Sequence, residues 1–142
     1  ILGTGGAAIG AIEACKNKNI DITVIGRSEE KLLELSKKYK INSLLLTDFK
    51  RIDIHYQVIN CLPPIVPIEY YLSDKSFLID MTYGLHNCNN TNIVNGYDIL
   101  FVQAAYQYLE WFGNDKKFEI IFNDYQKAIK LFLEKKYKLK QQ

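Results

Sequence analysis

The stretch ILGTGGAA, residues 1–8, decides the fold that this sequence predicts. Its two leading apolar residues predict the end of a buried strand, its glycines predict a tight turn, and the small and apolar residues from Ala7 to Cys15 predict a helix. Gly3, Gly5 and Ala8 match the G-x-G-x-x-G/A pattern of a dinucleotide-binding turn, whose glycines permit a sharp turn and the close approach of a pyrophosphate. The amino end of the helix would then face the phosphates. A glycine-rich turn beside a buried helix can also be purely structural, so the motif needs support from the rest of the chain.

The composition indicates one globular domain. The chain has 142 residues, of which 48% are apolar, and its net charge of +2 predicts no general attraction to nucleic acid or to a membrane. No apolar run reaches transmembrane length and no signal peptide is visible. Because the first residue is not Met and the first predicted strand is cut short, we expect a piece of a longer protein. The three scattered cysteines (Cys15, Cys61 and Cys88) favour a reduced, cytoplasmic setting without a metal site.

Strands are predicted to alternate with helices along the rest of the chain. The stretch 20–25 is rich in β-branched residues and predicts a strand, and Ser28 is predicted to cap a helix over 29–39 with Leu32, Leu33 and Leu35 facing inward. Short apolar strands are predicted over 43–46, 57–60, 77–80 and 93–94, a helical turn over 68–72, a surface loop over 85–92, and two closing helices over 97–112 and 124–139. This order predicts one α/β domain over residues 1–142, a three-layer, doubly wound, Rossmann-like parallel sheet whose first strand is truncated.

The residues after the second predicted strand indicate which dinucleotide would bind. A site for NAD has an Asp or Glu there, which accepts hydrogen bonds from the ribose 2′-hydroxyl. This chain has Arg27 and Ser28 instead, with Lys31 one helical turn later. Two cations and a hydroxyl suit the 2′-phosphate of NADP. Glu29 and Glu30 count mildly against this interpretation, and Arg27 could also be no more than part of a surface turn.

Separated stretches across nearly the whole chain resemble the C-terminal, NADP-binding domain of the shikimate dehydrogenase family. The matches are residues 3–8 to the family's G-x-G-G-A-A turn, residues 26–31 to its N-R-T-x-x-R/K segment, residues 59–63 to its I-N-A-T-P stretch and residues 80–83 to its D-x-x-Y. The most specific match is NGYDILFVQAA, residues 95–105, which is close to the family's N-G-x-x-M-L-x-x-Q-A-x and is followed by a similar aromatic-glycine pair.

The resemblance implies a role for each matching residue. Gly3 belongs to the turn, and Gly5, Gly6 and Ala7 would cradle the pyrophosphate. The 2′-phosphate and the adenosine ribose would be held by Arg27, Ser28 and Lys31. Lining the cofactor beyond the diphosphate would be Asn60, Cys61 and Leu62, with Met81 near the nicotinamide and the Gly96 backbone bonded to its carboxamide. Tyr83 and Gln103 would reach the substrate. No catalytic residue is assigned, because the family's catalytic Lys and Asp lie in an N-terminal substrate domain that is not in this chain. Tyr83, Met81 and Gln103 also have plain structural interpretations, as a half-buried tyrosine, a core filler and part of a polar stripe.

The activity that the resemblance implies is the reversible reduction of 3-dehydroshikimate to shikimate with NADPH, in aromatic amino acid biosynthesis. The fragment alone would bind NADP(H) without turnover. Its expected partners are the substrate, the absent N-terminal domain and a second copy of the chain, which would meet the aromatic faces of the closing helices at Tyr106, Tyr108, Trp111 and Phe132. Gly26 stands where the family usually has Asn, and Cys61-Leu62 where it has Ala-Thr. Alternatives therefore stay open: a quinate or other hydroxy-acid dehydrogenase, the NADPH domain of glutamyl-tRNA reductase (against which the Gln103 helix argues), or a non-catalytic nucleotide-binding domain.

Overall fold

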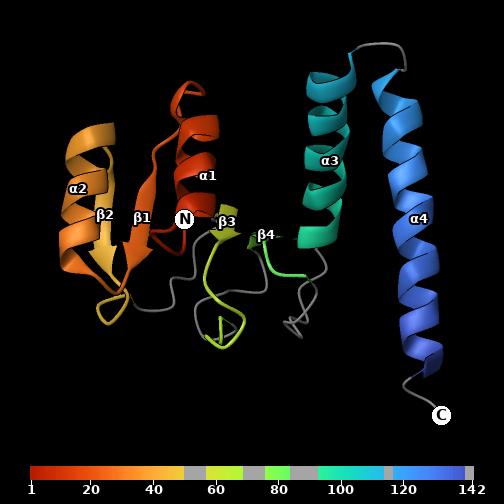
Figure 1. The fold of residues 1–142 in the computed structure, drawn as a ribbon. Coiled ribbons are helices and arrows are strands. Elements are labelled where there is room, and N and C mark those ends of the chain that lie inside the picture. The colour runs from red at the N-terminus through yellow and green to blue at the C-terminus, as the bar shows by residue number, and fades with distance from the viewer. Residues whose placement is uncertain (50–56, 69–75, 84–92, 114–116, 140–142) are drawn as a thin grey trace. The chain divides into compact units, whose positions relative to one another are not determined.

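In the computed structural model, residues 1–49, 57–68, 76–83, 93–113 and 117–139 are described. The elements follow in the order α1 (Gly6–Lys16), β1 (Thr23–Gly26), α2 (Glu29–Tyr39), β2 (Asn42–Leu45), β3 (Gln57–Asn60), β4 (Phe77–Asp80), β5 (Ile93–Asn95), α3 (Gly96–Phe112) and α4 (Phe118–Leu139), as Figure 1 shows. The chain forms two units, Ile1–Tyr97 and Asp98–Gln142. The first unit contains all of the described strands.

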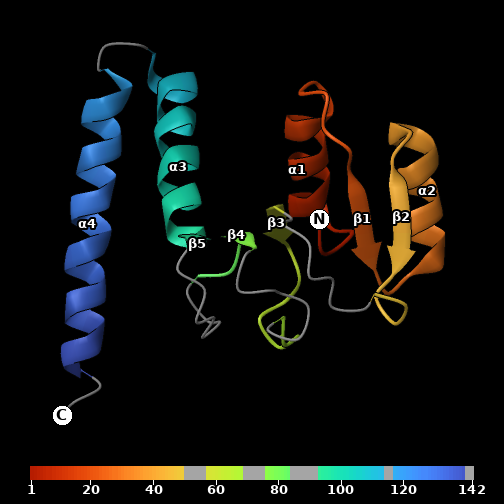
Figure 2. The same cartoon turned by 180° about the vertical axis from the view of Figure 1, so that it is seen from behind.

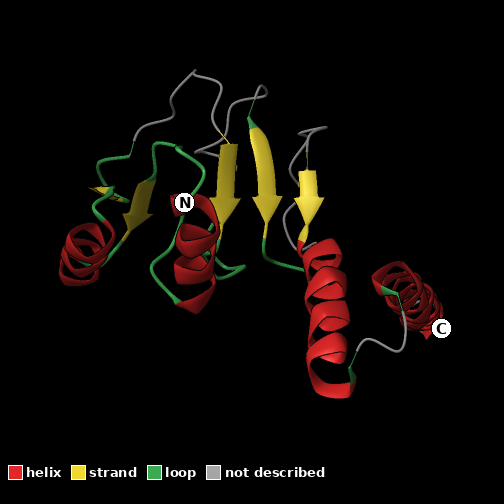
Figure 3. Ribbon diagram, turned by 90° about the horizontal axis from the view of Figure 1, so that it is seen from above, coloured by secondary structure: helices red, strands yellow, loops and turns green. Residues whose placement is uncertain are grey.

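The described strands run parallel. β1 pairs with β2, and β4 pairs with both β3 and β5; the arrows in Figure 3 show this arrangement. Leu2 forms parallel bridges to Ile25 of β1 and to Asn60 of β3. Its N–H donates to the Ile59 carbonyl and its own carbonyl accepts from the Cys61 N–H, each at 2.8 Å. The order is therefore β2-β1-Leu2-β3-β4-β5, which is the strand order of a Rossmann sheet with its first strand reduced to a stub. The predicted parallel, Rossmann-like α/β fold with a truncated first strand is confirmed.

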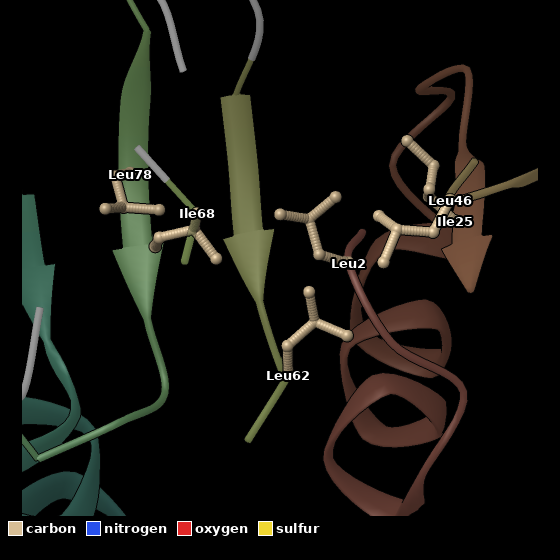
Figure 4. Close-up of a cluster of buried hydrophobic side chains, with 6 residues drawn as sticks. All are labelled: Leu2, Ile25, Leu46, Leu62, Ile68 and Leu78. Atoms are coloured by element: carbon tan, nitrogen blue, oxygen red, sulfur yellow. The ribbon is translucent and has the colours of Figure 1, made fainter. Parts of the chain in front are cut away.

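Both faces of this sheet are apolar. α1 and α2 lie on one side of the strands (Figure 3), and the buried cluster on that side consists of Ile12, Ile22, Val24, Leu32 and Leu35. Successive residues of a strand face opposite sides, so Ile25 points away from Val24 and into a second cluster. Its members, drawn in Figure 4, are Leu2, Ile25, Leu46, Leu62, Ile68 and Leu78. Figure 2 shows β1 and β2 from the side opposite α2. Burial on both faces explains why the strands are apolar at consecutive positions.

α2 has the predicted bounds, and a side chain caps its amino end. Ser28 has an extended backbone, and its side chain accepts a hydrogen bond from the Lys31 N–H at 3.4 Å. The helix buries Leu32 and Leu35 but leaves Leu33 51% exposed. The expectation that Leu33 faces inward is therefore wrong. At about 100° of rotation per residue, Leu33 lies about 100° from Leu32 and about 160° from Leu35 around the helix, and therefore on a different face from the stripe that those two share.

β1 is shorter than predicted. It begins at Thr23 rather than at residue 20, because its first partner in β2 is Asn42. The residues before it emerge from a turn after α1, in which Asn19 has a φ of 53°. The predicted loop over 85–92 and all but Ile68 of the predicted helical turn over 68–72 lie outside the described residues.

In the second unit, α3 and α4 pack side by side (Figure 1). α4 begins at Phe118, so the predicted start at residue 124 is wrong. Ring contacts with α3 explain the longer helix: Phe118 lies 4.8 Å from Tyr106 and Phe122 lies 6.3 Å from Phe101, between ring centroids. Tyr106 is nevertheless 59% exposed, and Trp111 is 72% exposed, whereas Tyr108 is partly exposed. The side chain of Phe132 lies outside the described ones.

Candidate functional site

The glycine turn lies between β1 and β3. The Gly3 N–H donates to the Ile25 carbonyl at 2.7 Å, and a Cβ on Gly3 would lie 3.0 Å from the Cys61 carbonyl oxygen. Gly3 also has a φ of 112°, which side chains disfavour. Both the turn and the close approach therefore require glycine. The strand order changes direction at this point of the sheet, and ligands of such folds bind in the crevice beyond the strand ends there.

α1 presents an open amino end beside this turn. Gly5 is the N-cap, no side chain of the described structure caps the helix, and the first turn has no acidic residue. Gly5, Gly6 and Ala7 are exposed, and a Cβ on Gly5 or Gly6 would meet no atom within 4 Å. The first N–H groups of a helix lack partners within it, and they lie at the positive end of its dipole. This end of α1 therefore fits the diphosphate of a dinucleotide.

The residues that follow β1 are cationic and exposed. Neither Arg27 nor Lys31 forms an ion pair with any residue that the structure describes. Ser28 sits at the amino end of α2 as its N-cap, so an anion next to it would also meet the positive end of that helix. The Glu29 and Glu30 side chains are exposed as well. The geometry brings two cations, one hydroxyl and one helix end together in five consecutive positions.

A buried polar network links the ends of β3 and β4. The side chains of Asn60 and Asp80, which are 0% and 4% exposed, stand opposite each other in the strand register. The Asn60 Nδ2 group donates to Asp80 Oδ1 at 2.8 Å, while Asn60 Oδ1 accepts from the Leu62 N–H at 3.1 Å. Asp80 also accepts from the Thr82 N–H at 3.1 Å and from the Thr82 hydroxyl at 2.7 Å. One carboxylate thus holds the loops after both strands.

Asn60 is one of the residues predicted to line the cofactor beyond the diphosphate. Its side chain faces this network and is not exposed. Leu62 is also buried, as a member of the cluster in Figure 4. Cys61 lies between them and is half-buried. Burial raises the pKa of its thiol to about 11, so near neutral pH it is a protonated, weakly nucleophilic group.

The loop after β4, which contains Met81 and Tyr83, lies against Gly96 at the start of α3. A Cβ on Gly96 would lie 2.5 Å from the Thr82 carbonyl oxygen and 2.8 Å from that of Met81, so only glycine fits at the start of α3. Its N–H donates to the Thr82 carbonyl at 3.2 Å. Tyr83 is 49% exposed, and its ring centroid lies 5.4 Å from that of Tyr97. Gln103, the other residue expected at the substrate, belongs to α3 in the second unit and has an exposed side chain.

Three residues that organise the glycine turn and the loops after β3 and β4 are absent from the site predicted from the sequence: Thr4, Asp80 and Thr82. The strand register provides a signal for Asp80, because FLID and QVIN both end in a polar residue after three-residue runs that are mostly apolar. Thr82 follows as the hydroxyl two residues later. Thr4 has no comparable signal, because its importance comes from a contact with Gly26 across the turn.

A cavity of about 210 Å³ lies at the opposite edge of the sheet, where the strands begin, and its lining is mainly apolar, with Ile20, Ile22, Leu44, Phe49 and Val58 among the side chains. Within the described ranges there is no cluster of His, Cys, Asp and Glu that could hold a metal ion. None of the helices described is long and apolar enough to cross a bilayer.

Comparisons with known proteins support the fold. No protein-family model matches the chain, and no curated protein matches it in sequence. Among solved structures, shikimate 5-dehydrogenase from Thermus thermophilus in complex with shikimate is similar, with a TM-score of 0.65 and 17% identity. The structure of that enzyme in complex with NADP(H) and shikimate gives a TM-score of 0.68 and 16% identity. The match covers 89% of this chain and 52–53% of those chains. The chain thus spans about half of their length and has the fold of that half.

Proposed function

We propose that this chain is the NADP-binding half of a shikimate dehydrogenase, an enzyme that reversibly reduces 3-dehydroshikimate to shikimate with NADPH. The observation that carries the proposal is the open amino end of α1, beside the place in the sheet where the strand order reverses, between the Leu2 stub and β3. A helix end of this kind at a switch point of the sheet suits a diphosphate. The sequence resemblance and the shared fold support the same proposal.

In this proposal the chain binds and orients the coenzyme, which supplies the hydride when it is bound. The N–H groups of Gly5, Gly6 and Ala7 donate to the diphosphate. Arg27 and Lys31, with the Ser28 hydroxyl, hold the 2′-phosphate through charge-assisted hydrogen bonds. The loops after β3 and β4 lie farther along the coenzyme, and Met81 and the Gly96 backbone meet the nicotinamide. Tyr83 and Gln103 are assigned to the substrate. The catalytic Lys and Asp belong to a domain outside these residues.

Calorimetric titration of the chain with NADP⁺ and with NAD⁺ tests the cofactor assignment. We expect NADP⁺ to bind at least about tenfold more tightly, because hydrogen bonds to a charged group contribute about 1.5–3 kcal/mol. Arg27→Ala should remove most of that difference and leave NAD⁺ affinity unchanged. Lys18→Ala, which removes an exposed cation elsewhere, is the matched control. Equal affinity for the two coenzymes would contradict the NADP assignment, and no binding of either would favour the non-catalytic alternative.

Two further parts of the proposal concern partners. The chain mixed with shikimate and NADP⁺ should show no turnover, and robust formation of NADPH, followed by its absorbance, would mean that the second domain is unnecessary. The exposed aromatic side chains of Tyr106 and Trp111 are proposed to mediate self-association in the isolated chain. Sedimentation at increasing concentration tests this, with Trp111→Lys expected to keep the chain monomeric.

A further inference from the structure

Gly26, the last residue of β1, has no room for a side chain because Thr4 occupies that room. A Cβ on Gly26 would lie 2.6 Å from Thr4 Cγ2, which is closer than real Cβ contacts, whereas the next nearest atom, Leu32 Cδ2, would lie at an ordinary 3.5 Å. Gly26 is not among the described residues with positive φ, so its backbone would accept any residue. The methyl group of Thr4 is therefore what excludes a side chain at position 26.

The backbones on both sides of this contact are fixed. The Gly26 carbonyl accepts from the Leu46 N–H at 2.8 Å, and Gly26 stands in register with Leu45 of β2. Thr4 follows Gly3, which is bonded to Ile25 on one side and lies against the Cys61 carbonyl on the other. A β-branched side chain has few χ1 rotamers. Because both backbones are held in place, a side chain at position 26 could be accommodated only by a change at residue 4. That change would be a rotation of the Thr4 side chain, which its branching restricts, or its replacement by a smaller residue.

Under the proposed function, the adenosine end of the dinucleotide would bind between the glycine turn and Arg27, beside this pair. We propose that the Thr4 side chain replaces a side chain at position 26 as the wall of the adenosine pocket, with its hydroxyl bonded to the ribose or its phosphate. Thr4 is half-buried, and its hydroxyl has no hydrogen-bond partner among the described residues. The steric exchange between positions 4 and 26 stands without a coenzyme, whereas the contact with the nucleotide rests on the proposed function.

A cycle of variants without coenzyme tests the steric exchange. Gly26→Ala alone should lower Tm by about 5 °C or more, as overpacking does. In a Thr4→Ser background, which keeps the hydroxyl and lacks the methyl group, the same substitution should leave Tm unchanged or raise it, because alanine loses less chain entropy than glycine on folding. In a Thr4→Val background, which keeps the methyl group, Gly26→Ala should again lower Tm. An equal effect of Gly26→Ala in all three backgrounds would overturn the steric exchange.

Calorimetry with adenosine 2′,5′-bisphosphate, which carries only the adenosine end of NADP, tests the contact with the nucleotide. Thr4→Ser should bind it within about twofold of the unmodified chain, and Thr4→Val about three- to tenfold more weakly, the range for the loss of one hydrogen bond. Full affinity in Thr4→Val would overturn the role of the hydroxyl. If the unmodified chain binds neither this probe nor NADP⁺, the proposed function fails and the pocket role fails with it, while the melting-temperature cycle still decides the steric exchange.

Discussion

Replacing Asp80 by alanine should destabilise the chain and disorder the two loops that follow β3 and β4. The Asp80 carboxylate is 4% exposed and accepts hydrogen bonds from Asn60 Nδ2, the Thr82 N–H and the Thr82 hydroxyl. Alanine removes all of these acceptors. The Thr82 hydroxyl can rotate toward another acceptor, but the Asn60 amide and the Thr82 N–H are held in place by β3 and by the turn after β4.

The expected loss follows from the two donors left without a partner. A buried polar group that loses its acceptor costs about 1–3 kcal/mol, so Asp80→Ala should lower the free energy of unfolding by about 2–6 kcal/mol. That is a large share of a typical total of about 5–15 kcal/mol. Asp80→Asn should cost far less, because its remaining carbonyl can accept from Asn60 and its amide can donate to the Thr82 hydroxyl, which also accepts.

Urea unfolding followed by circular dichroism measures these free energies. Asp21→Ala, which removes an exposed carboxylate at the opposite edge of the sheet, is the matched control and should change stability by less than about 0.5 kcal/mol. Amide hydrogen exchange at Leu62 and Thr82 should accelerate in Asp80→Ala more than exchange in α2 does. An Asp80→Ala variant within about 1 kcal/mol of the unmodified chain would refute the account of the network.

Three shorter predictions concern single side chains. Gly96→Ala should lower the free energy of unfolding by about 1–3 kcal/mol or more, because its Cβ would lie 2.5 Å from the Thr82 carbonyl; Gly10→Ala, in open space within α1, should instead raise Tm. Ser28→Ala should cost about 1 kcal/mol in urea unfolding through loss of the α2 cap, and no loss would mean that the 3.4 Å bond is not a working cap. Because burial raises the pKa of Cys61 from 9.0 to about 11, the unfolded thiol ionises at lower pH than the folded one. This contribution to stability is present below about pH 9 and is lost as pH rises toward 11, a slope that Cys61→Ala should remove.

Local sequence signals were sufficient wherever a local interaction sets the structure. The glycine turn, the α2 cap at Ser28 and the strands Gln57–Asn60 and Phe77–Asp80 have the predicted bounds. Each depends on residues a few positions apart: a cap and the N–H three residues later, or an apolar run that ends at a polar residue. The parallel order of the sheet followed from the alternation of strands and helices.

The features that the sequence did not reveal depend on contacts between distant segments. The start of α4 at Phe118 depends on ring contacts with Tyr106 and Phe101 in α3. The bond between Asn60 and Asp80 depends on a register that places two residues opposite each other. Thr4 excludes a side chain at Gly26 only because the turn is folded back against β1. These contacts join residues that are far apart in the sequence, so the order of residue types alone does not predict them.

The positions at which this chain departs from the shikimate dehydrogenase pattern keep their backbone hydrogen bonds and their packing. Cys61 and Leu62, which stand where the family has Ala-Thr, contribute backbone N–H groups that any residue other than proline provides: the first donates to the Leu2 carbonyl and the second to Asn60 Oδ1. The Leu62 side chain is buried in the core. Where the family's threonine has a hydroxyl group, this chain therefore has an apolar side chain that packs in the core. At Gly26, the Thr4 methyl group occupies the room that a side chain would need. In each case the backbone at this end of the sheet keeps its support, so these substitutions do not disturb the fold around the proposed coenzyme site.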